Sequence, residues 1–149
     1  MKRPFSLYIL LALHFFLGIN GFAGGLLLLL APDGSLLGLQ AGWLAHSPFR
    51  NYFIPGMLLL LFNGIFPLFV FTGLIRRPRW AFADVLNIYR DRHWAWTYSL
   101  FAGIISIAWI TVQQVMTNYF WIQPVIIATG LLIIICTMMP RVMKAYSEK

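Results

Sequence analysis

Four long apolar stretches dominate the chain, and polar segments separate them. They run over residues 5–31, 54–75, 94–116 and 120–140. Each is long enough to cross a hydrocarbon layer of about 30 Å as an α-helix. The pattern therefore predicts an all-α fold, a four-helix transmembrane bundle that forms a single integral membrane domain over residues 1–149.

Two of the connections carry patterns of their own. After Pro78, apolar residues recur at helical spacing between spans two and three, at Phe82, Val85, Leu86 and Tyr89. This spacing predicts a short amphipathic helix at the membrane interface. Between spans one and two, a Pro-Asp-Gly turn at 32–34 and an apolar run at 35–45 predict a partly helical loop that covers the outer face.

Composition excludes several classes of protein. Hydrophobic residues make up 60% of the chain and charged residues 10%, whereas soluble domains have about 25% charged residues. All four acidic residues lie outside the apolar runs, so no span offers the carboxylate that ion pumps usually use. Cys136 is the single cysteine, which excludes a disulfide pair or a thiolate metal cage within one chain. We expect no metal and no cofactor.

The basic residues predict the orientation. Ten of the eleven lysines and arginines precede span one, lie between spans two and three, or follow span four, and Arg50 is the exception. By the positive-inside rule, we expect a multi-pass protein of the inner (plasma) membrane with both termini in the cytoplasm. The net charge of +7 then indicates contact with anionic headgroups of membrane lipids and not with nucleic acid.

Polar residues inside the spans supply the candidate chemistry. Asn20, Asn63, Ser106 and Thr129 fall near the middle of the four spans. One interpretation is that they form hydrogen bonds between helices. The other is a cavity for an uncharged ligand in the outer half of the bundle, for which the candidate residues are Asn20, Asn63, Gln113, Gln123, His46 and Asn51.

Two further features have structural interpretations. His14 lies in span one, and neither His46 nor His93 lies at its depth, so a bis-histidine haem site is not expected. We interpret His14 as a hydrogen-bonded packing residue. Gly21, Gly25 and Gly103 permit close helix approach, either within the chain or to a second copy or a partner membrane subunit.

The segments Ser47-Pro48-Phe49 and Pro55-Gly56 occur together with Tyr52, Trp109, Gln113 and the pair Gln123-Pro124. In this layout the chain resembles a family of small prokaryotic four-span integral membrane proteins. The resemblance implies a plasma-membrane location and supplies no activity. The chain is also similar in length, span number and charge to the membrane-associated eicosanoid and glutathione metabolism family. That family binds glutathione through an Arg, an Asn and a Glu of span two. Here only the Arg and the Asn have counterparts, Arg50 and Asn51.

These observations favour a small membrane protein that binds a lipid or a small neutral molecule, or that acts as an accessory or scaffold subunit. We predict no catalytic residue. The alternative is a glutathione-dependent or lipid-modifying membrane enzyme of the eicosanoid and glutathione type.

Overall fold

The computed structural model describes residues 3–148. Its elements follow in the order α1 (Phe5–Leu30), η1 (Ser35–Leu37), η2 (Ala41–Leu44), α2 (Phe53–Leu58), η3 (Leu59–Ile65), α3 (Phe66–Arg76), α4 (Ala81–Asp84), α5 (Trp94–Met116), α6 (Ile122–Met138) and α7 (Pro140–Ala145). The elements η1 and η2 are 3-10 turns, and η3 is π-helical. Residues 3–148 contain no β-strand, so the predicted all-α class is confirmed.

Of the helices in the described residues, three are long and apolar enough to cross a membrane. They are α1, the continuous helix Phe53–Arg76 made of α2, η3 and α3, and α5. The fourth apolar helix, α6, has 17 residues and is shorter than the predicted run 120–140. It ends at Met138 because Met139 precedes a proline and adopts an extended conformation (φ −61°, ψ 132°), as residues before proline usually do.

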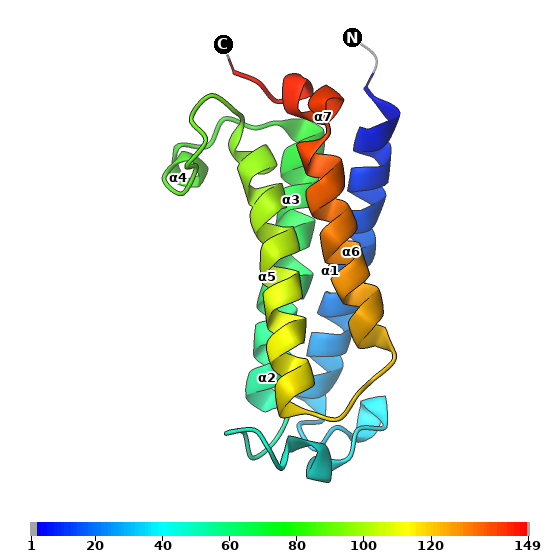
Figure 1. The fold of residues 1–149 in the computed structure, drawn as a ribbon. Helices are drawn as coiled ribbons and strands as arrows, with labels where there is room; N and C mark the ends of the chain where they lie inside the picture. The colour runs from blue at the N-terminus through cyan, green and yellow to red at the C-terminus, as the bar shows by residue number, and fades with distance from the viewer. Residues whose placement is uncertain (1–2, 149) are drawn as a thin grey trace.

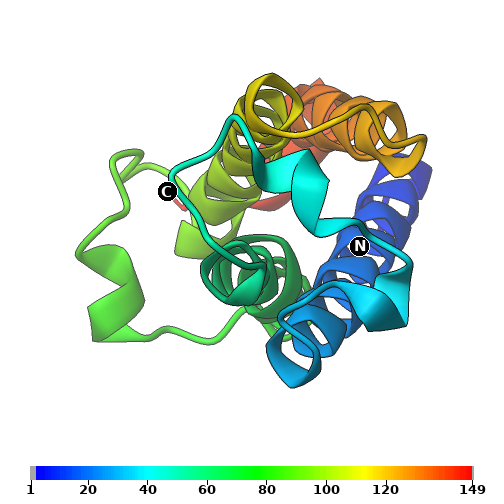
Figure 2. The ribbon, with the colours of Figure 1, turned by 90° about the horizontal axis from the view of Figure 1, so that it is seen from below.

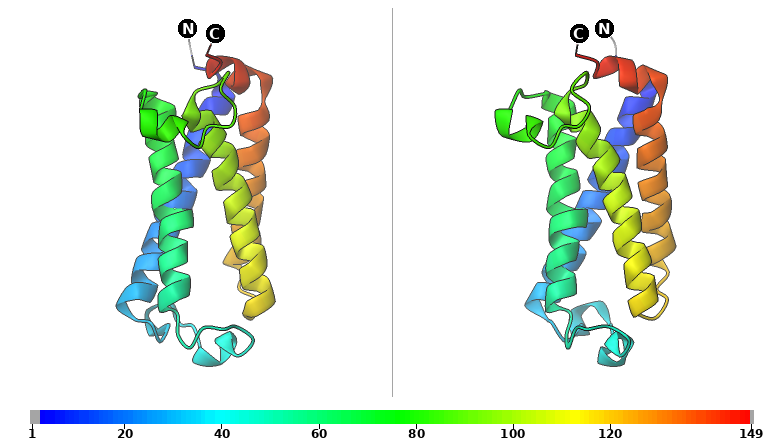
Figure 3. Two further views of the ribbon diagram at one scale, coloured as in Figure 1. Left: turned by 90° about the vertical axis from the view of Figure 1, so that its left-hand side faces the viewer. Right: turned by 60° about the vertical axis from the view of Figure 1, so that its left-hand side comes forward.

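The long helices run lengthwise beside one another, and both ends of the described chain lie at the same end of the molecule (Figure 1). We call this the termini end, and the opposite end, which carries residues 31–52, the loop end. Helix α1 runs obliquely: it lies near α6 and α7 toward the termini end and beside α2 at the loop end (Figures 1 and 3). Helix α1 is therefore closer to α6 toward the termini end than at the loop end (Figure 3).

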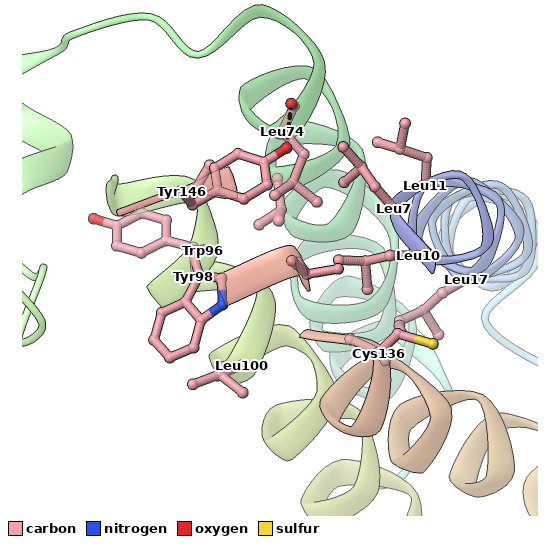
Figure 4. Close-up of a cluster of buried hydrophobic side chains, with 14 of the residues drawn as sticks. Leu7, Leu10, Leu11, Leu17, Leu74, Trp96, Tyr98, Leu100, Cys136 and Tyr146 are labelled. Atoms are coloured by element: carbon pink, nitrogen blue, oxygen red, sulfur yellow. Dashed lines mark hydrogen bonds between the residues drawn. The ribbon is translucent and has the colours of Figure 1, made fainter. Parts of the chain in front are cut away.

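The main core fills the half nearer the termini. Figure 4 shows leucines of α1 meeting Leu74 of α3 and Cys136 of α6, with Trp96 of α5 close by. The Tyr146 hydroxyl group donates to the Leu74 carbonyl group at 2.6 Å, which ties the segment after α7 to α3. A smaller cluster of Leu28, Leu44 and Tyr52 packs under the loop at the other end.

Arginines close the termini end. Arg77 Nη1 donates to the Ala145 carbonyl group and Arg92 Nη1 to that of Met143, each at 2.9 Å. Arg3 Nη2 donates to the Ile75 carbonyl group at the same distance. These bonds reach carbonyl groups in the last turns of α3 and α7, where the intrahelical partners run out, although the Met143 carbonyl group also accepts from the Tyr146 N–H group. Lys2 and Lys149, which the sequence assigns to this end, lie outside the described residues.

The connection between α3 and α5 differs from the prediction. A single helical turn forms, α4, and residues 85–93 are irregular. Other hydrogen bonds compete with the helix: the Tyr98 hydroxyl group of α5 donates to the Ala83 carbonyl group, and within the connection Asn87 Nδ2 donates to the Arg92 carbonyl group. The short amphipathic helix that we expected through Tyr89 is therefore limited to residues 81–84.

Candidate functional site

A cavity of about 380 Å³ lies between the helices in the half nearer the loop end. Its walls come from α1, η3, α5 and α6, and residues of the loop cover its end. Its volume lies within the range of about 300–1,000 Å³ that is typical of small-molecule pockets. Most of the lining is apolar, and the polar lining residues are Asn20, Asn63, Gln113, Thr117, Asn118 and Gln123.

The structure brings together four of the six residues that the sequence pointed to. Asn20 from α1, Asn63 from η3, Gln113 from α5 and Gln123 from α6 all line this one cavity. A void therefore separates these amides, which the ligand-binding interpretation requires.

The other two candidates, His46 and Asn51, are exposed in the loop and are not among the lining residues. Asn51 has a local structural role instead, because its Oδ1 accepts from the backbone N–H of Phe53 at 3.1 Å. This bond satisfies one of the free N–H groups at the start of α2.

Asn63 is the most unusual residue in the lining. Its side chain is 1% exposed, and neither Nδ2 nor Oδ1 has a hydrogen-bond partner within residues 3–148. Leaving a buried polar group without a partner costs about 1–3 kcal/mol. Unsatisfied buried groups are rare in native proteins, and each requires an explanation.

The local backbone explains why Asn63 lies where it does. Pro67 has no N–H group to donate to the Asn63 carbonyl group four residues earlier. The helix widens at this point, and the Phe66 N–H group donates to the Leu61 carbonyl group, five residues back. Such π-helical segments are short and occur frequently at functional sites.

The other three amides have partners or are more exposed. Gln123 is 2% exposed; its Oε1 accepts from the Phe120 N–H group at 3.1 Å, which fixes the turn between α5 and α6. Asn20 Nδ2 donates to the Phe16 carbonyl group of its own helix. Gln113 is half-buried.

Aromatic side chains from the loop cover the end of the cavity. The lining includes Trp43 and Tyr52, and the ring of Trp43 meets that of Phe120 at 6.4 Å between centroids. Figure 2 shows the loop running across the ends of the helices. These residues were not among the predicted site residues; the apolar run 35–45 indicated a cover but not which side chains it would contribute.

Tyr52 holds this cover in place. Its backbone N–H donates to the Pro32 carbonyl group and its hydroxyl group to that of Gln40, both at 2.8 Å. Burial raises the pKa of Tyr52, so the hydroxyl group remains a donor at neutral pH. Its ring also lies against Gly34, which adopts a left-handed conformation (φ 82°) that few other residues tolerate.

Asp33 stabilises the first turn of the loop. The backbone N–H and the hydroxyl group of Ser35 both donate to Asp33 Oδ1, at 3.1 and 2.7 Å. These two bonds lower the pKa of Asp33, so the turn keeps its carboxylate acceptor through the neutral and mildly acidic range. The loop is therefore an ordered cover and not a loose tether.

A second polar cluster lies in the half nearer the termini, and it joins three helices. His14 Nε2 lies 2.8 Å from Ser99 Oγ, and Ser99 Oγ lies 2.7 Å from Thr137 Oγ1. Thr137 donates its hydroxyl hydrogen to the Ile133 carbonyl group, so Ser99 donates to Thr137 and His14 donates from Nε2 to Ser99. His14 is therefore buried and hydrogen-bonded through Nε2, as the packing interpretation expects.

Ser106 and Thr129 do not form the bonds between helices that one interpretation assigned to them. Ser106 Oγ donates to the Ala102 carbonyl group and Thr129 Oγ1 to that of Val125, each within its own helix. A hydroxyl group on a helix reaches the carbonyl group four residues earlier without a partner helix. The His14 cluster forms bonds between helices instead, and so does Trp96 of α5, whose Nε1 donates to the Thr137 carbonyl group of α6 at 2.8 Å.

The glycines form contacts within the chain. A Cβ atom on Gly21 would overlap the Asn63 carbonyl group, and one on Gly25 would lie 2.6 Å from the Leu60 nitrogen. A Cβ atom on Gly103 would lie 2.8 Å from the Gly130 carbonyl oxygen. These three residues therefore bring α1 against η3 and α5 against α6, and an interface with a second copy would require other residues.

No family model, curated protein or solved structure matches the chain. The cavity and its chemistry are therefore the basis for proposing a function.

Proposed function

We propose that the chain is a four-span protein of the plasma membrane, with α6 as the fourth span and both termini in the cytoplasm. Three membrane-length helices support this proposal. Helix α6 is about 25 Å long at 1.5 Å per residue, near the lower limit for a span, and it packs along α5. Arg3, Arg77 and Arg92 lie at the termini end, as the positive-inside rule requires of a cytoplasmic face.

Within this topology, the protein binds a neutral lipid or another small uncharged molecule in the cavity. The observation that carries the proposal is Asn63, a residue of the cavity lining whose buried amide has no partner for either side-chain atom in the described chain. A ligand with a hydrogen-bonding group would satisfy it. The described residues that line the cavity include no Asp, Glu, His, Lys, Arg or Cys, so a neutral ligand suits the site better than an ion.

The rival functions receive no comparable support. Arg50 and Asn51, the counterparts of glutathione-binding residues, are exposed and are not among the lining residues of the cavity. The glycines that were candidates for contact with a partner subunit pack within the chain.

Two neighbouring glutamines of α5 provide the test. Gln113 lines the cavity, whereas Gln114 is exposed and is not among the lining residues. The wild-type protein and the variants Gln113→Leu and Gln114→Leu are each purified in lipid nanodiscs. Native mass spectrometry then counts the ligands that each protein retains. We expect the wild type to retain an uncharged ligand, Gln113→Leu to bind it about tenfold more weakly through loss of one hydrogen bond, and Gln114→Leu to bind it normally. A wild type without ligand, or equal behaviour of both variants, would contradict the proposal.

A further inference from the structure

We infer that the ligand is an uncharged lipid with a hydroxyl or amide group, and that it reaches the cavity sideways from the outer leaflet through an opening between α1 and α6. This inference rests on the proposed function and adds a ligand class and a route. Three observations carry it: which lining residues are exposed, how the loop covers the cavity, and which chemistry the unpartnered amide requires.

The exposed lining residues indicate the opening. Asn20 and Ala23 line the cavity and are exposed, although they lie in the middle and outer part of a 26-residue apolar helix. At that depth in the membrane, the surroundings of the protein are lipid chains and not water. A cavity that leaves these two side chains exposed is therefore open toward lipid.

The course of the helices explains why the opening lies there. Toward the termini end, α1 and α6 are joined through the Ser99 link between His14 and Thr137. Toward the loop end the two helices diverge, because α1 turns to lie along α2 (Figure 3). Residues of both helices line the cavity in this region, with Ala23 on one side and Ile122 on the other.

The loop covers the end of the cavity that faces water. Trp43 meets Phe120 across the end of the cavity, and Tyr52 fixes the loop through its bonds to Pro32 and Gln40. A ligand dissolved in water would have to displace this ordered loop. A ligand dissolved in the membrane would not.

The chemistry of Asn63 limits the ligand class. Its Nδ2 is a donor and its Oδ1 an acceptor, and both lack a partner in the described chain. A hydroxyl or amide group can both accept and donate, whereas an ester or a simple ketone can only accept. The apolar lining, which includes Leu17, Leu27 and Leu59, provides the surface for a hydrocarbon chain.

The experiment uses a monoacylglycerol with a diazirine on its chain, which is an uncharged single-chain lipid with hydroxyl groups. The full-length protein in phosphatidylcholine nanodiscs is irradiated with this probe, and the cross-linked peptides are mapped by mass spectrometry. We expect labelling of the cavity-lining parts of α1 and α6, and we expect excess unlabelled monoacylglycerol to suppress it. Excess phosphatidylglycerol, which is charged, should leave it unchanged.

Matched tryptophans test the route. Ala23→Trp fills the opening, whereas Ala128→Trp introduces the same side chain at an exposed position of α6 outside the lining. We expect Ala23→Trp to lower cavity labelling at least about tenfold, which corresponds to a loss of about 1.4 kcal/mol of binding free energy. Ala23→Leu should lower the labelling less, and Ala128→Trp should leave it unchanged. Ala23→Leu preserves the test if the tryptophan variant does not fold.

The outcomes separate the inference from the function on which it rests. If no uncharged molecule binds the wild type saturably, the proposed function fails. If a ligand binds but Ala23→Trp and Ala128→Trp label alike, the side opening is wrong. If water-soluble glycerol competes as well as the monoacylglycerol does, the lipid class is wrong, while ligand binding itself stands.

Discussion

At the scale of single residues, Asn63 lowers the stability of the ligand-free protein. Its amide is buried and unpartnered, and an apolar side chain of similar shape would avoid that cost. Natural proteins often sacrifice stability in this way at functional positions. Ser6, His14 and Trp109 also have a buried polar atom without a partner, and Asn63 differs from them because it lines the cavity.

We therefore predict that Asn63→Leu stabilises the ligand-free protein by about 1–3 kcal/mol and weakens ligand binding. The measurement is the free energy of unfolding in mixed micelles, with and without the co-purified ligand. Gln114→Leu serves as the control, because this residue is exposed. A loss of stability in the ligand-free Asn63→Leu protein would show that the amide has a partner in the folded state.

Ser99 and Ser106 both lie on α5, but their hydroxyl groups form hydrogen bonds of different kinds. Ser99 links His14 to Thr137 across three helices, whereas Ser106 bonds within α5. We predict that Ser99→Ala lowers the free energy of unfolding by about 1–2 kcal/mol, because it leaves the buried N–H of His14 without an acceptor. Ser106→Ala should change it by less than about 0.5 kcal/mol, within the range of mutations away from such contacts. Equal effects in the same unfolding assay would contradict the cluster's role.

At the scale of helices and loops, the hydrophobic runs predicted most of what the structure shows. Long apolar stretches have few alternatives to a helix in a membrane, so the positions of α1 and α5 followed closely from the sequence. The four amides followed in part: Asn63 is buried, as a polar side chain in an apolar run is expected to be, whereas Asn20 lines the cavity and is exposed.

The rest depends on tertiary contacts that no local pattern contains. The segment after Pro78 has helical spacing, yet its helix is limited to α4, and Tyr98 and Thr97 of α5 donate to Ala83 and Asn87 of this segment. Likewise, the spacing of Trp43 and Tyr52 gave no sign that both would cover a cavity. The glycine spacing was compatible with contacts inside or outside the chain, and only the packing of α1 on η3 distinguishes them.

Two glycines of α1 test that packing. A Cβ atom on Gly21 would overlap the backbone of Asn63, whereas one on Gly24 would lie 3.4 Å from a Leu59 side-chain carbon, an ordinary contact. We predict that Gly21→Ala lowers the free energy of unfolding by about 1–3 kcal/mol relative to Gly24→Ala, as overpacking does. Both variants gain similar helix propensity, so their difference isolates the contact. If the two unfold alike, the close approach of α1 and η3 is wrong.

At the scale of the whole molecule, the two halves differ in construction. The half nearer the termini has the larger core, the His14 cluster and the arginine bonds to helix ends. The other half has the cavity and the ordered loop. Close packing at one end holds the helices together, so they can diverge at the other end and leave space for a ligand.

The orientation of this asymmetric molecule decides which leaflet supplies the ligand, and labelling tests which way the hollow half faces. Among the lysines and arginines that the structure describes, Arg50 alone belongs to the loop end, so the positive-inside rule predicts that the termini are cytoplasmic. In a Cys136→Ala background, we predict that an impermeant maleimide labels Leu36→Cys in intact cells. Glu148→Cys should react only after the cells are permeabilised. Both positions are exposed, so they differ chiefly in the side of the membrane on which they lie. Labelling of Glu148→Cys in intact cells would reverse the orientation, and the cavity would then draw its ligand from the cytoplasmic leaflet.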